Sequence, residues 1–345
     1  MLKKILKTIS WKPEILRVKL CILALAFLFA GEAAADTFNM KIGIVTRNDP
    51  IFVYAEEFKR RIEEKTNGRI KAEVFAGGQL GKVQQLIQGA QFGSVEMFIA
   101  PPGFLKGIEP AFQSADVVGL FDNIEHGHAS LTDPAFRDPF LQIGINKGLV
   151  GVSIFAYGGT SFATQEPFKT LADLKGQKIR VLATKVEAGL MDKLGATGIP
   201  MPFGDIVPAL QRGIIDGVRS SIVATGAIKV HTVVKNITVT DEATIPVVSM
   251  VSRKFYEKLP SDLQAAVLEV GKEMEPYMLK VVQKSEANGE QMWIDGGATI
   301  YRLSEAERRN LLDIGRGVTE TVLGGNPSTQ LHYRRLKDAA DNNRQ

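Results

Sequence analysis

One arginine, Arg180, lies inside an otherwise apolar run of strand-forming residues, between Ile179 and Val181. A guanidinium in such a place must be paired or must face a cavity, because burying an unpaired charge costs too much free energy. Its planar fork matches a carboxylate in two parallel hydrogen bonds. The residues alone therefore leave three interpretations open: a clamp for a ligand carboxylate, an internal ion pair with an Asp or Glu, and an edge strand with Arg180 in water.

Other residues that could carry chemistry are few. His126 and His128 could be two ligands of a metal, but no third ligand stands at a recognisable spacing, so we expect a solvated loop there. The chain has no G-x-S-x-G or P-loop motif, and the glycines of GGQLG lack the order of a dinucleotide site. We therefore predict no catalytic residue, no metal and no cofactor.

The elements that must position Arg180 alternate between strand and helix patterns. Strands are predicted at 41–46, 70–75, 95–100, 149–157, 178–183, 217–223 and 246–252. Helices are predicted at 50–66, 83–92, 185–194 and 205–212. This alternation indicates an α/β fold with a mostly parallel sheet and helices on its faces.

The two halves of the chain share a pattern. QLIQGAQFGSVEMFIA in the first half parallels ALQRGIIDGVRSSIV in the second, since in both a helix ends in glycine and a strand follows a tight turn. This predicts two similar lobes, although any α/β protein contains such joints. The C-terminal third differs: a long helix is predicted over 261–296, kinked at Pro276 and able to brace both lobes. A last helix follows over 304–318, and the polar tail from Asn326 is expected to be frayed.

Residues 1–35 have the pattern of a signal peptide: a basic head, a ten-residue apolar run over 21–30, and an A-x-A ending at Ala35. The run is shorter than the roughly 20 residues of a membrane span, so we predict cleavage before Asp36. The alternative is an uncleaved anchor. Cys21, the only cysteine, would leave with the signal. A mature chain without thiols suits an oxidising compartment.

The charge balance changes when this segment is removed. The whole chain has 42 Lys and Arg against 38 Asp and Glu. Residues 1–35 hold six basic and two acidic groups, so the remainder carries 36 of each and no net charge. Nucleic acid is therefore not expected as a partner. No later apolar run is long enough to span a membrane, and about 310 residues are enough for two cores.

Three blocks stand in order along the chain: EEKTNGRIKAEVFAGGQLG, LADLKGQKIRV and LGATGIPMPFGDIVPALQRGIIDGV. They resemble the DctP family, the periplasmic solute-binding components of TRAP (tripartite ATP-independent periplasmic) transporters. The resemblance implies an α/β, two-lobed periplasmic binding protein fold with mixed sheets, crossing hinge strands and a long bracing helix. It implies one lobe from 36–157 plus 246–285 and another from 158–245 plus 286–345.

The resemblance also implies ligand contacts. Arg180 takes the place of the family's carboxylate clamp, and Phe203 takes that of a pocket aromatic, where general packing rules would otherwise favour a core residue. Arg219 and Ser220 lie near a polar contact that follows Asp-Gly, although Arg219 could also be a surface charge. Independently of the family, Arg47 follows a predicted strand at the end where α/β crevices form, which makes it a further candidate.

Departures from the family pattern bear on the ligand. Thr160 stands where the sialic-acid binders carry a second arginine, and Ser220 stands where they carry asparagine. Pro101 and Pro102 replace a glutamate that some members use. Arg219 lies near the position of a glutamate in members that bind a cation, so again no metal is expected. These departures disfavour a sugar acid and favour a smaller or more apolar carboxylate, such as a dicarboxylate or an aromatic acid.

The sequence therefore predicts a periplasmic protein that captures a small carboxylate and delivers it to TRAP-type membrane permease subunits. It is not predicted to be an enzyme. A sensor or receptor subunit would bind in the same way, and the sequence does not separate it from a transport protein. An enzyme using the same cleft would need a nucleophile or an acid–base pair facing the ligand, and the blocks that resemble the family hold no histidine or cysteine.

Overall fold

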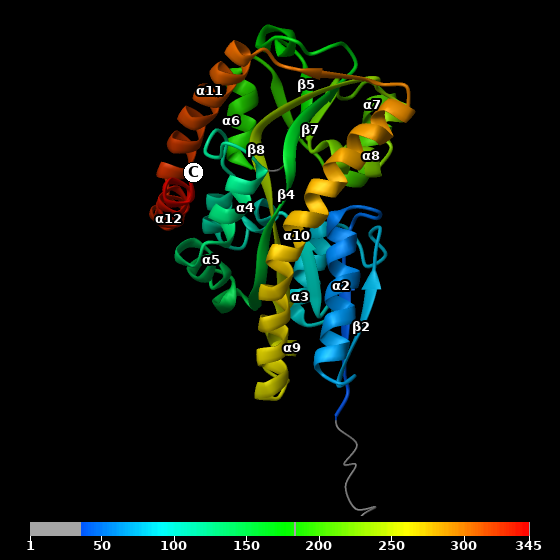
Figure 1. Cartoon of the computed structure of the whole chain (residues 1–345), viewed down its shortest axis with the longest axis vertical. Coiled ribbons are helices and arrows are strands. Elements are labelled where there is room, and N and C mark those ends of the chain that lie inside the picture. Colours follow the sequence, from blue (N-terminus) through cyan, green and yellow to red (C-terminus); the bar gives the residue numbers. More distant parts are fainter. Residues whose placement is uncertain (1–35, 183, 345) are drawn as a thin grey trace, which may run out of the picture. The chain divides into compact units, whose positions relative to one another are not determined.

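Two long antiparallel strands, β4 (Leu149–Thr164) and β8 (Asn236–Ser252), run through the middle of the sheet (Figure 1). The structure is a computed structural model that describes residues 36–182 and 184–344. The predicted signal peptide and Cys21 lie outside the described residues. Residues 39–345 form one compact unit, which contains nearly the whole sheet and the described helices. None of its helices in the described part is long and apolar enough to cross a membrane.

The described strands form one nine-stranded mixed sheet in the order β2–β1–β3–β8–β4–β7–β5–β6, with β9 paired to β8. Strand β1 is parallel to β3, and β5 is parallel to both β6 and β7, whereas β8 is antiparallel to β3 and β4. The shorter strands are β1 (Phe38–Gly43), β2 (Ile70–Phe75), β3 (Met97–Ala100), β5 (Lys178–Val181), β6 (Thr197–Pro200), β7 (Gly217–Ser220) and β9 (Thr299–Arg302). The central strands thus join a first group, β2, β1 and β3, to a second group, β7, β5 and β6.

Helices stand at the positions that the sequence predicts, and the described residues form five more that it does not predict. They are α2 (Pro50–Lys65), α3 (Val83–Phe92), α4 (Ile124–Thr132), α5 (Pro134–Leu141), α6 (Lys185–Lys193), α7 (Ile206–Gln211), α8 (Ile222–Ala227), α9 (Arg253–Tyr256), α10 (Ser261–Asp295), α11 (Glu305–Gly324) and α12 (Pro327–Asn343). Short 3-10 turns are η1 (Pro102–Leu105), η2 (Pro110–Ala115), η3 (Ile145–Lys147), η4 (Leu171–Leu174), η5 (Phe203–Asp205) and η6 (Val230–Thr232). Asp49 caps α2 by accepting a hydrogen bond from the Phe52 amide. Asn67 and Gly68, both with left-handed backbone, follow the end of this helix as predicted.

The longest helix, α10, has 35 residues and contains Pro276. It packs against α2 in the first half of the chain, against β4, and against α8 in the second half. Figure 1 shows it running alongside both α2 and α8. Its buried stripe includes Leu263, Val270 and Met278. This is the bracing helix that the sequence predicts.

Several predicted strand ends are wrong: β1 is shifted three residues toward the N-terminus, β8 begins ten residues earlier than predicted, and β4 and β7 end elsewhere. Strand β4 does not stop at Gly158 and Gly159 but continues to Thr164, with register shifts against β8 on both sides of the glycine pair. A Cβ atom on Gly159 would overlap the Asp241 carboxylate, which explains why glycine stands there. Strand β7 ends early, at Ser220, because the Ser221 hydroxyl accepts a hydrogen bond from the Ala224 amide and begins α8.

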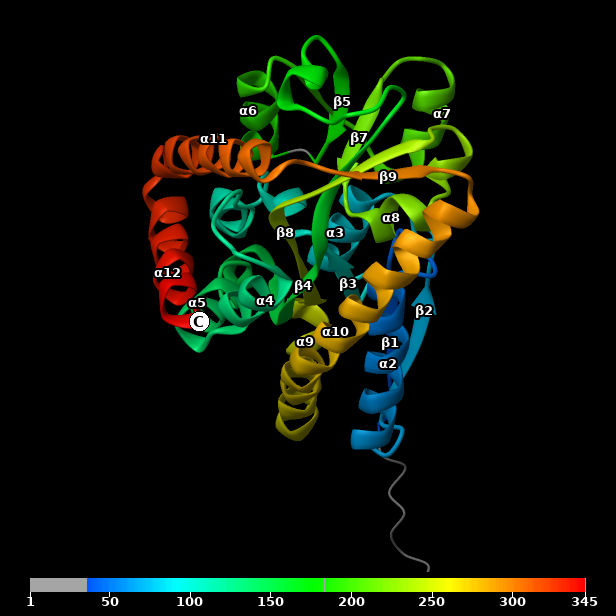
Figure 2. The ribbon, with the colours of Figure 1, turned by 45° about the horizontal axis from the view of Figure 1, so that its top comes forward.

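The predicted C-terminal tail is also wrong. Helix α11 continues beyond Val318 to Gly324, and residues from Asn326 onward form α12 instead of fraying. The tail is polar on average, but Leu336, Ala339 and Ala340 share a buried face at helical spacing. Helix α12 packs against η2, α4 and α5, which belong to the region predicted as the first lobe, whereas α12 itself was predicted to belong to the second (Figure 2).

Candidate binding site

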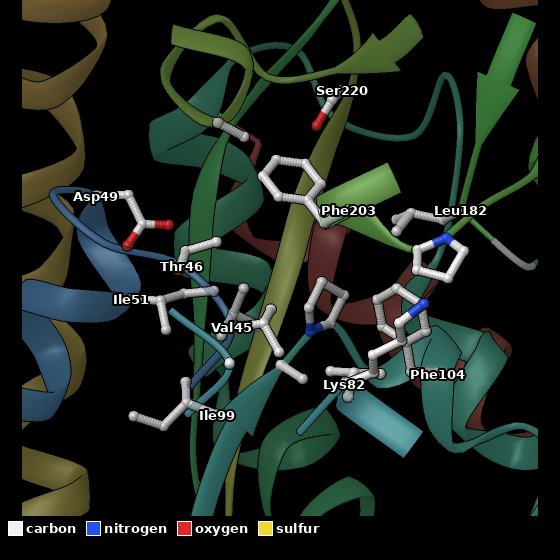
Figure 3. A pocket seen from close by; sticks show the side chains of 18 of the residues that line it. Val45, Thr46, Asp49, Ile51, Lys82, Ile99, Phe104, Leu182, Phe203 and Ser220 are labelled. Atoms are coloured by element: carbon white, nitrogen blue, oxygen red, sulfur yellow. The ribbon is translucent and has the colours of Figure 1, made fainter. Parts of the chain in front are cut away.

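A cavity of about 340 Å³ lies where the two groups of strands meet. The first group contributes residues that follow the carboxyl ends of β1, β2 and β3, and the second contributes residues at or after the ends of β5, β6 and β7. Ligand crevices of α/β proteins form at such strand ends. Much of the wall is apolar, and Figure 3 shows part of it. The apolar side chains include Val45, Ile51, Ile99, Phe104, Leu182, Phe203, Ile245 and Val247.

Arg180 lines this cavity, and its guanidinium is only partly satisfied by the protein. The residue is fully buried on β5, between β6 and β7. Its Nε donates to the carbonyl oxygen of Met201 at 3.1 Å, whereas Nη1 and Nη2 are buried without a hydrogen-bond partner. Burial lowers the pKa of Arg180 to about 10, an effect that Glu187 opposes and Arg219 reinforces. Arg180 is therefore a cation at neutral pH with two free donor nitrogens.

Three further residues of the predicted site also line the cavity. The Phe203 ring lies 5.5 Å from the Arg180 guanidinium carbon, in the range of a cation–π contact. Ser220 ends β7, and Pro101 follows β3 just before η1. The structure thus brings Arg180, Phe203, Ser220 and Pro101 to one cavity from both groups of strands.

Arg219 and Thr160 are not among the residues that line the cavity. The Arg219 guanidinium forms ion pairs with Glu187 at 2.6 Å and Glu242 at 2.7 Å, all three side chains being buried. The Thr160 hydroxyl donates to the other oxygen of Glu242 at 2.5 Å. Burial disfavours the charged guanidinium, but the two glutamates hold the pKa of Arg219 above its usual value. The internal ion pair that the residues left open for Arg180 is thus realised at Arg219.

Arg47 is also placed outside the cavity lining. Its Nη2 donates to the carbonyl oxygen of Ala76 at 2.9 Å, and its side chain lies over Gly77 so closely that a Cβ there would overlap it. The neighbouring Thr46 lines the cavity instead. Residues after β1 therefore do line the cavity, but Arg47 itself holds the loop between β2 and α3 in place.

The cavity holds polar groups that the sequence did not reveal. Asp49 and Tyr157 both line it, and the Tyr157 hydroxyl donates to Asp49 Oδ2 at 2.8 Å. Burial raises the pKa of Asp49, while the bonds from the Phe52 amide and Tyr157 favour its ionised form; the nearby Thr46 hydroxyl acts in the same direction without reaching hydrogen-bond geometry. The sequence signal that could have identified Asp49 is its position directly before Pro50, between the end of a strand and the start of a helix.

Lys82 is the other cation of the lining. It precedes α3 in the first half of the chain, and its ammonium forms an ion pair with Asp205 of η5, in the second half, at 3.1 Å. Both side chains are about half exposed. This pair connects the two sides of the cavity at its surface, and a pair so exposed contributes on the order of 1 kcal/mol or less.

The two histidines expected in a solvated loop lie elsewhere. His126 and His128 are buried in α4. Nε2 of His126 is 2.8 Å from the carbonyl oxygen of Ala340, and Nδ1 of His128 accepts from the Ala156 amide at 3.4 Å. Burial lowers the pKa of His128 to about 4. Both rings therefore serve packing between α4, α12 and β4, and no group of three metal-ligating side chains is found among the described residues.

Comparison with known proteins places this geometry among binding proteins. A family model described as "Bacterial extracellular solute-binding protein, family 7" (DctP) matches residues 43–321. The chain is 27% identical over 314 residues to the 2,3-diketo-L-gulonate-binding periplasmic protein YiaO of Escherichia coli. The alignment covers 89% of this chain and 92% of that protein. It is 25% identical over 291 residues to the C4-dicarboxylate-binding periplasmic protein DctP of Rhodobacter capsulatus, with coverages of 83% and 86%.

Solved structures show the same fold. A TRAP periplasmic solute-binding protein from Desulfovibrio salexigens, solved with bound orotic acid, matches with a TM-score of 0.84 at 22% identity, covering 89% of this chain and 100% of that one. Another, from Xanthobacter autotrophicus with bound β-D-galacturonate, matches with a TM-score of 0.79 at 24% identity, covering 87% and 99%. The predicted two-lobed α/β fold is confirmed by these likenesses.

Proposed function

Because the chain belongs to family 7 of the bacterial extracellular solute-binding proteins, the DctP family, we propose that it captures a small organic carboxylate in the periplasm. The ligand then passes to the membrane permease subunits of a TRAP transporter. Two relatives are named for a diketo sugar acid and for C4 dicarboxylates, ligands that share a carboxylate. The sequence identity of both relatives to this chain is below 30%. We therefore propose only that the ligand of this chain has a carboxylate, and we do not transfer the rest of either relative's ligand.

The observation that carries this proposal is the pair of unpartnered nitrogens on Arg180. Two buried donors without an acceptor are costly, so an anion that supplies two acceptors is strongly favoured at this point. A carboxylate matches the two nitrogens in geometry and charge. The Phe203 ring flanks the guanidinium, and Ser220 offers a hydroxyl at the end of the next strand. Arg180 is the clamp in this proposal.

Arg219, Thr160 and Arg47 have a different part in this proposal. Each already has protein partners and lies outside the cavity lining, so we do not assign them ligand contacts. Arg219 and Glu187 lie near enough to Arg180 to influence its pKa, Glu187 raising it and Arg219 lowering it.

Capture by closure of two lobes accounts for the arrangement of the central strands. We propose a hinge where the paired strands β4 and β8 pass from one group of strands to the other, near Gly158 and Gly159, because the register shifts there weaken the ladder. The predicted lobes, 36–157 plus 246–285 and 158–245 plus 286–345, divide the chain at this point, except that α12 packs with the first. Closure excludes water and strengthens the bond between Arg180 and the carboxylate. No bond of the ligand is broken in this proposal.

The test is thermal unfolding of the exported protein with a panel of acids: valerate, benzoate, succinate, glutarate, 4-hydroxybenzoate and D-glucuronate. At 100 times its Kd, a bound acid stabilises the fold by about 2.7 kcal/mol. Arg180→Met should abolish that shift, whereas Arg302→Met, a control at an exposed arginine on β9, should keep it. An acid that stabilises both Arg180→Met and the wild type equally would remove Arg180 as the clamp. A panel without any binder would contradict the function itself.

A further inference from the structure

A cluster of polar side chains occupies part of the cavity supplied by the first half of the chain. Asp49 stands in the loop after β1, and Tyr157 stands on β4. Both are more than nine-tenths buried. Figure 3 shows Asp49 and Leu182, which is two residues beyond Arg180, on opposite sides of the Phe203 ring in this view. Asp49 is thus contributed by the loop after β1, and Arg180 is contributed by β5.

Helix capping alone does not account for the acid. Asparagine, serine or threonine caps a helix about as well as aspartate, and all of them would avoid the cost of a buried carboxylate beside an apolar wall. A second observation points to a ligand: the Thr46 hydroxyl lines the same cavity, is 7% exposed, and has no hydrogen-bond partner. Polar groups of the protein therefore remain unsatisfied in this part as well as at Arg180.

The hydrogen bonds of the cluster leave acceptors free. Asp49 accepts one bond from the Phe52 amide and one from the Tyr157 hydroxyl. A carboxylate offers about four acceptor positions, so about two remain. The Tyr157 hydroxyl donates its proton to Asp49, and the Ser221 hydroxyl lies close enough to act as a donor to the Tyr157 oxygen. The Asp49 carboxylate therefore keeps acceptor capacity, and the unpartnered Thr46 hydroxyl is a donor beside it.

The rest of the cavity lining limits which ligand groups can lie near Asp49. Much of the rest of the cavity wall is apolar, with side chains such as Ile99, Phe203 and Val247. The remaining cation, Lys82, is already paired with Asp205 and does not neutralise Asp49. A second ligand carboxylate near Asp49 would therefore meet an anion without a compensating charge.

We propose that Asp49 and Tyr157 form a subsite for a hydrogen-bond donor, a hydroxyl or N–H group on the part of the ligand remote from its carboxylate. The preferred ligand is a monocarboxylate with a flat or apolar body and a donor at its other end. Dicarboxylates are disfavoured, because Asp49 accepts hydrogen bonds and the lining cation Lys82 is already paired with Asp205. This inference rests on the proposed function, in which Arg180 holds the carboxylate, and it narrows the ligand class beyond the aromatic acids and dicarboxylates that the sequence left together.

The test uses matched acids that differ only at the remote end. One set is benzoate, 4-hydroxybenzoate, 4-methoxybenzoate and terephthalate; the other is valerate, 5-hydroxyvalerate and glutarate. D-glucuronate adds an acid with many hydroxyls. Affinities are measured by isothermal titration calorimetry on the exported wild type, Asp49→Asn and Tyr157→Phe. Asp49→Asn keeps the cap of α2, and Asp133→Asn makes the same change at the cap of α5, away from the cavity.

We expect the tightest ligand of the wild type to carry a donor. Asp49→Asn and Tyr157→Phe should each weaken that ligand by about 10-fold to 100-fold, the effect of losing a hydrogen bond to a charged or buried partner. Asp49→Asn should also tighten terephthalate or glutarate relative to the wild type, while Asp133→Asn changes neither. Circular dichroism and Tm verify that the variants are folded.

Three outcomes would overturn the subsite and leave the proposed function standing. The tightest ligand could be a dicarboxylate, it could be an acid without a donor such as 4-methoxybenzoate, or its affinity could be unchanged in both variants. In each case Arg180→Met would still abolish binding. If no acid of the series binds the wild type, the proposed function fails and the subsite fails with it. The two failures are therefore distinguishable.

Discussion

Replacing each of the two buried arginines with methionine should have opposite effects on the ligand-free protein. Both side chains are at most 2% exposed, and methionine keeps most of the apolar stem. In Arg219→Met, Glu187 and Glu242 lose a partner that lies 2.6 and 2.7 Å away. In Arg180→Met, the hydrogen bond lost is the one from Nε to the carbonyl oxygen of Met201. The same substitution therefore removes a cation with two ion pairs, of which only Nη2 lacks a partner, in one case and a cation with two unpartnered nitrogens in the other.

The magnitudes follow from the surroundings of each guanidinium. Breaking a buried ion pair by removing one partner costs about 3–5 kcal/mol of unfolding free energy, which is the expectation for Arg219→Met. Burial lowers the pKa of Arg180 from 12.5 to about 10, so its charge destabilises the fold by roughly 3 kcal/mol. Losing the hydrogen bond and losing the contact with Phe203 each cost about 1 kcal/mol, which offsets part of the gain from removing the buried charge. Arg180→Met should thus leave stability unchanged or raise it by about 1 kcal/mol.

The assay is urea unfolding at pH 7.5 without ligand, followed by circular dichroism, with Arg302→Met as an exposed control. Arg219→Met should lie at least about 3 kcal/mol below Arg180→Met. A loss of stability in Arg180→Met as large as that in Arg219→Met would mean that Arg180 has an internal partner. In that case Nη1 and Nη2 of Arg180 would not be available to a ligand.

Two further perturbations test the buried carboxyl of Asp116 and the close approach of Asp241 to Gly159. Burial, with a smaller contribution from Glu187, raises the pKa of Asp116 to about 7 from an ordinary value of 3.8. The folded state takes up this proton as the pH falls through 7, well before the unfolded chain does, so stability should rise by about 1 kcal/mol between pH 8 and pH 6. Urea midpoints should show that Asp116→Asn removes this gain, and an unchanged pH slope would contradict the assignment. Gly159→Ala should lower stability by about 1–3 kcal/mol, because its Cβ would overlap Asp241, whereas the control Gly107→Ala has open space and should change little on thermal unfolding.

Local patterns were enough for elements whose limits are set by neighbouring residues. Strand β2 and helix α3 begin and end at the predicted residues, since Gly93 takes a left-handed conformation directly after α3. Strand β4 was predicted too short because Gly158 and Gly159 indicate a break locally. Its pairing with β8, which lies about 80 residues away in the chain, carries it past them.

The candidate site shows the same division. Arg180 and Arg219 each lie in a four-residue strand directly after an apolar residue, and the local sequence does not show which of them has an internal partner. The two arginines differ in their partners. Glu187 and Glu242 both form ion pairs with Arg219, whereas neither glutamate is within hydrogen-bond distance of Arg180. These partners come from other elements, so only the assembled fold or the family resemblance could favour Arg180. Asp49 and Tyr157 were missed for a similar reason, since their meeting joins a loop to a distant strand.

Strand β7 carries Arg219 and Ser220 side by side, and successive side chains of a strand point to opposite faces. One face holds the buried ion pairs, and the other meets the cavity. Mutational tolerance should therefore alternate from one residue to the next along this strand. Changes at Ser220 can retune what the protein accepts at little cost in folding, whereas changes at Arg219 threaten the fold before they reach the ligand. A lineage could exchange one nutrient for another through the cavity face while the opposite face stays fixed.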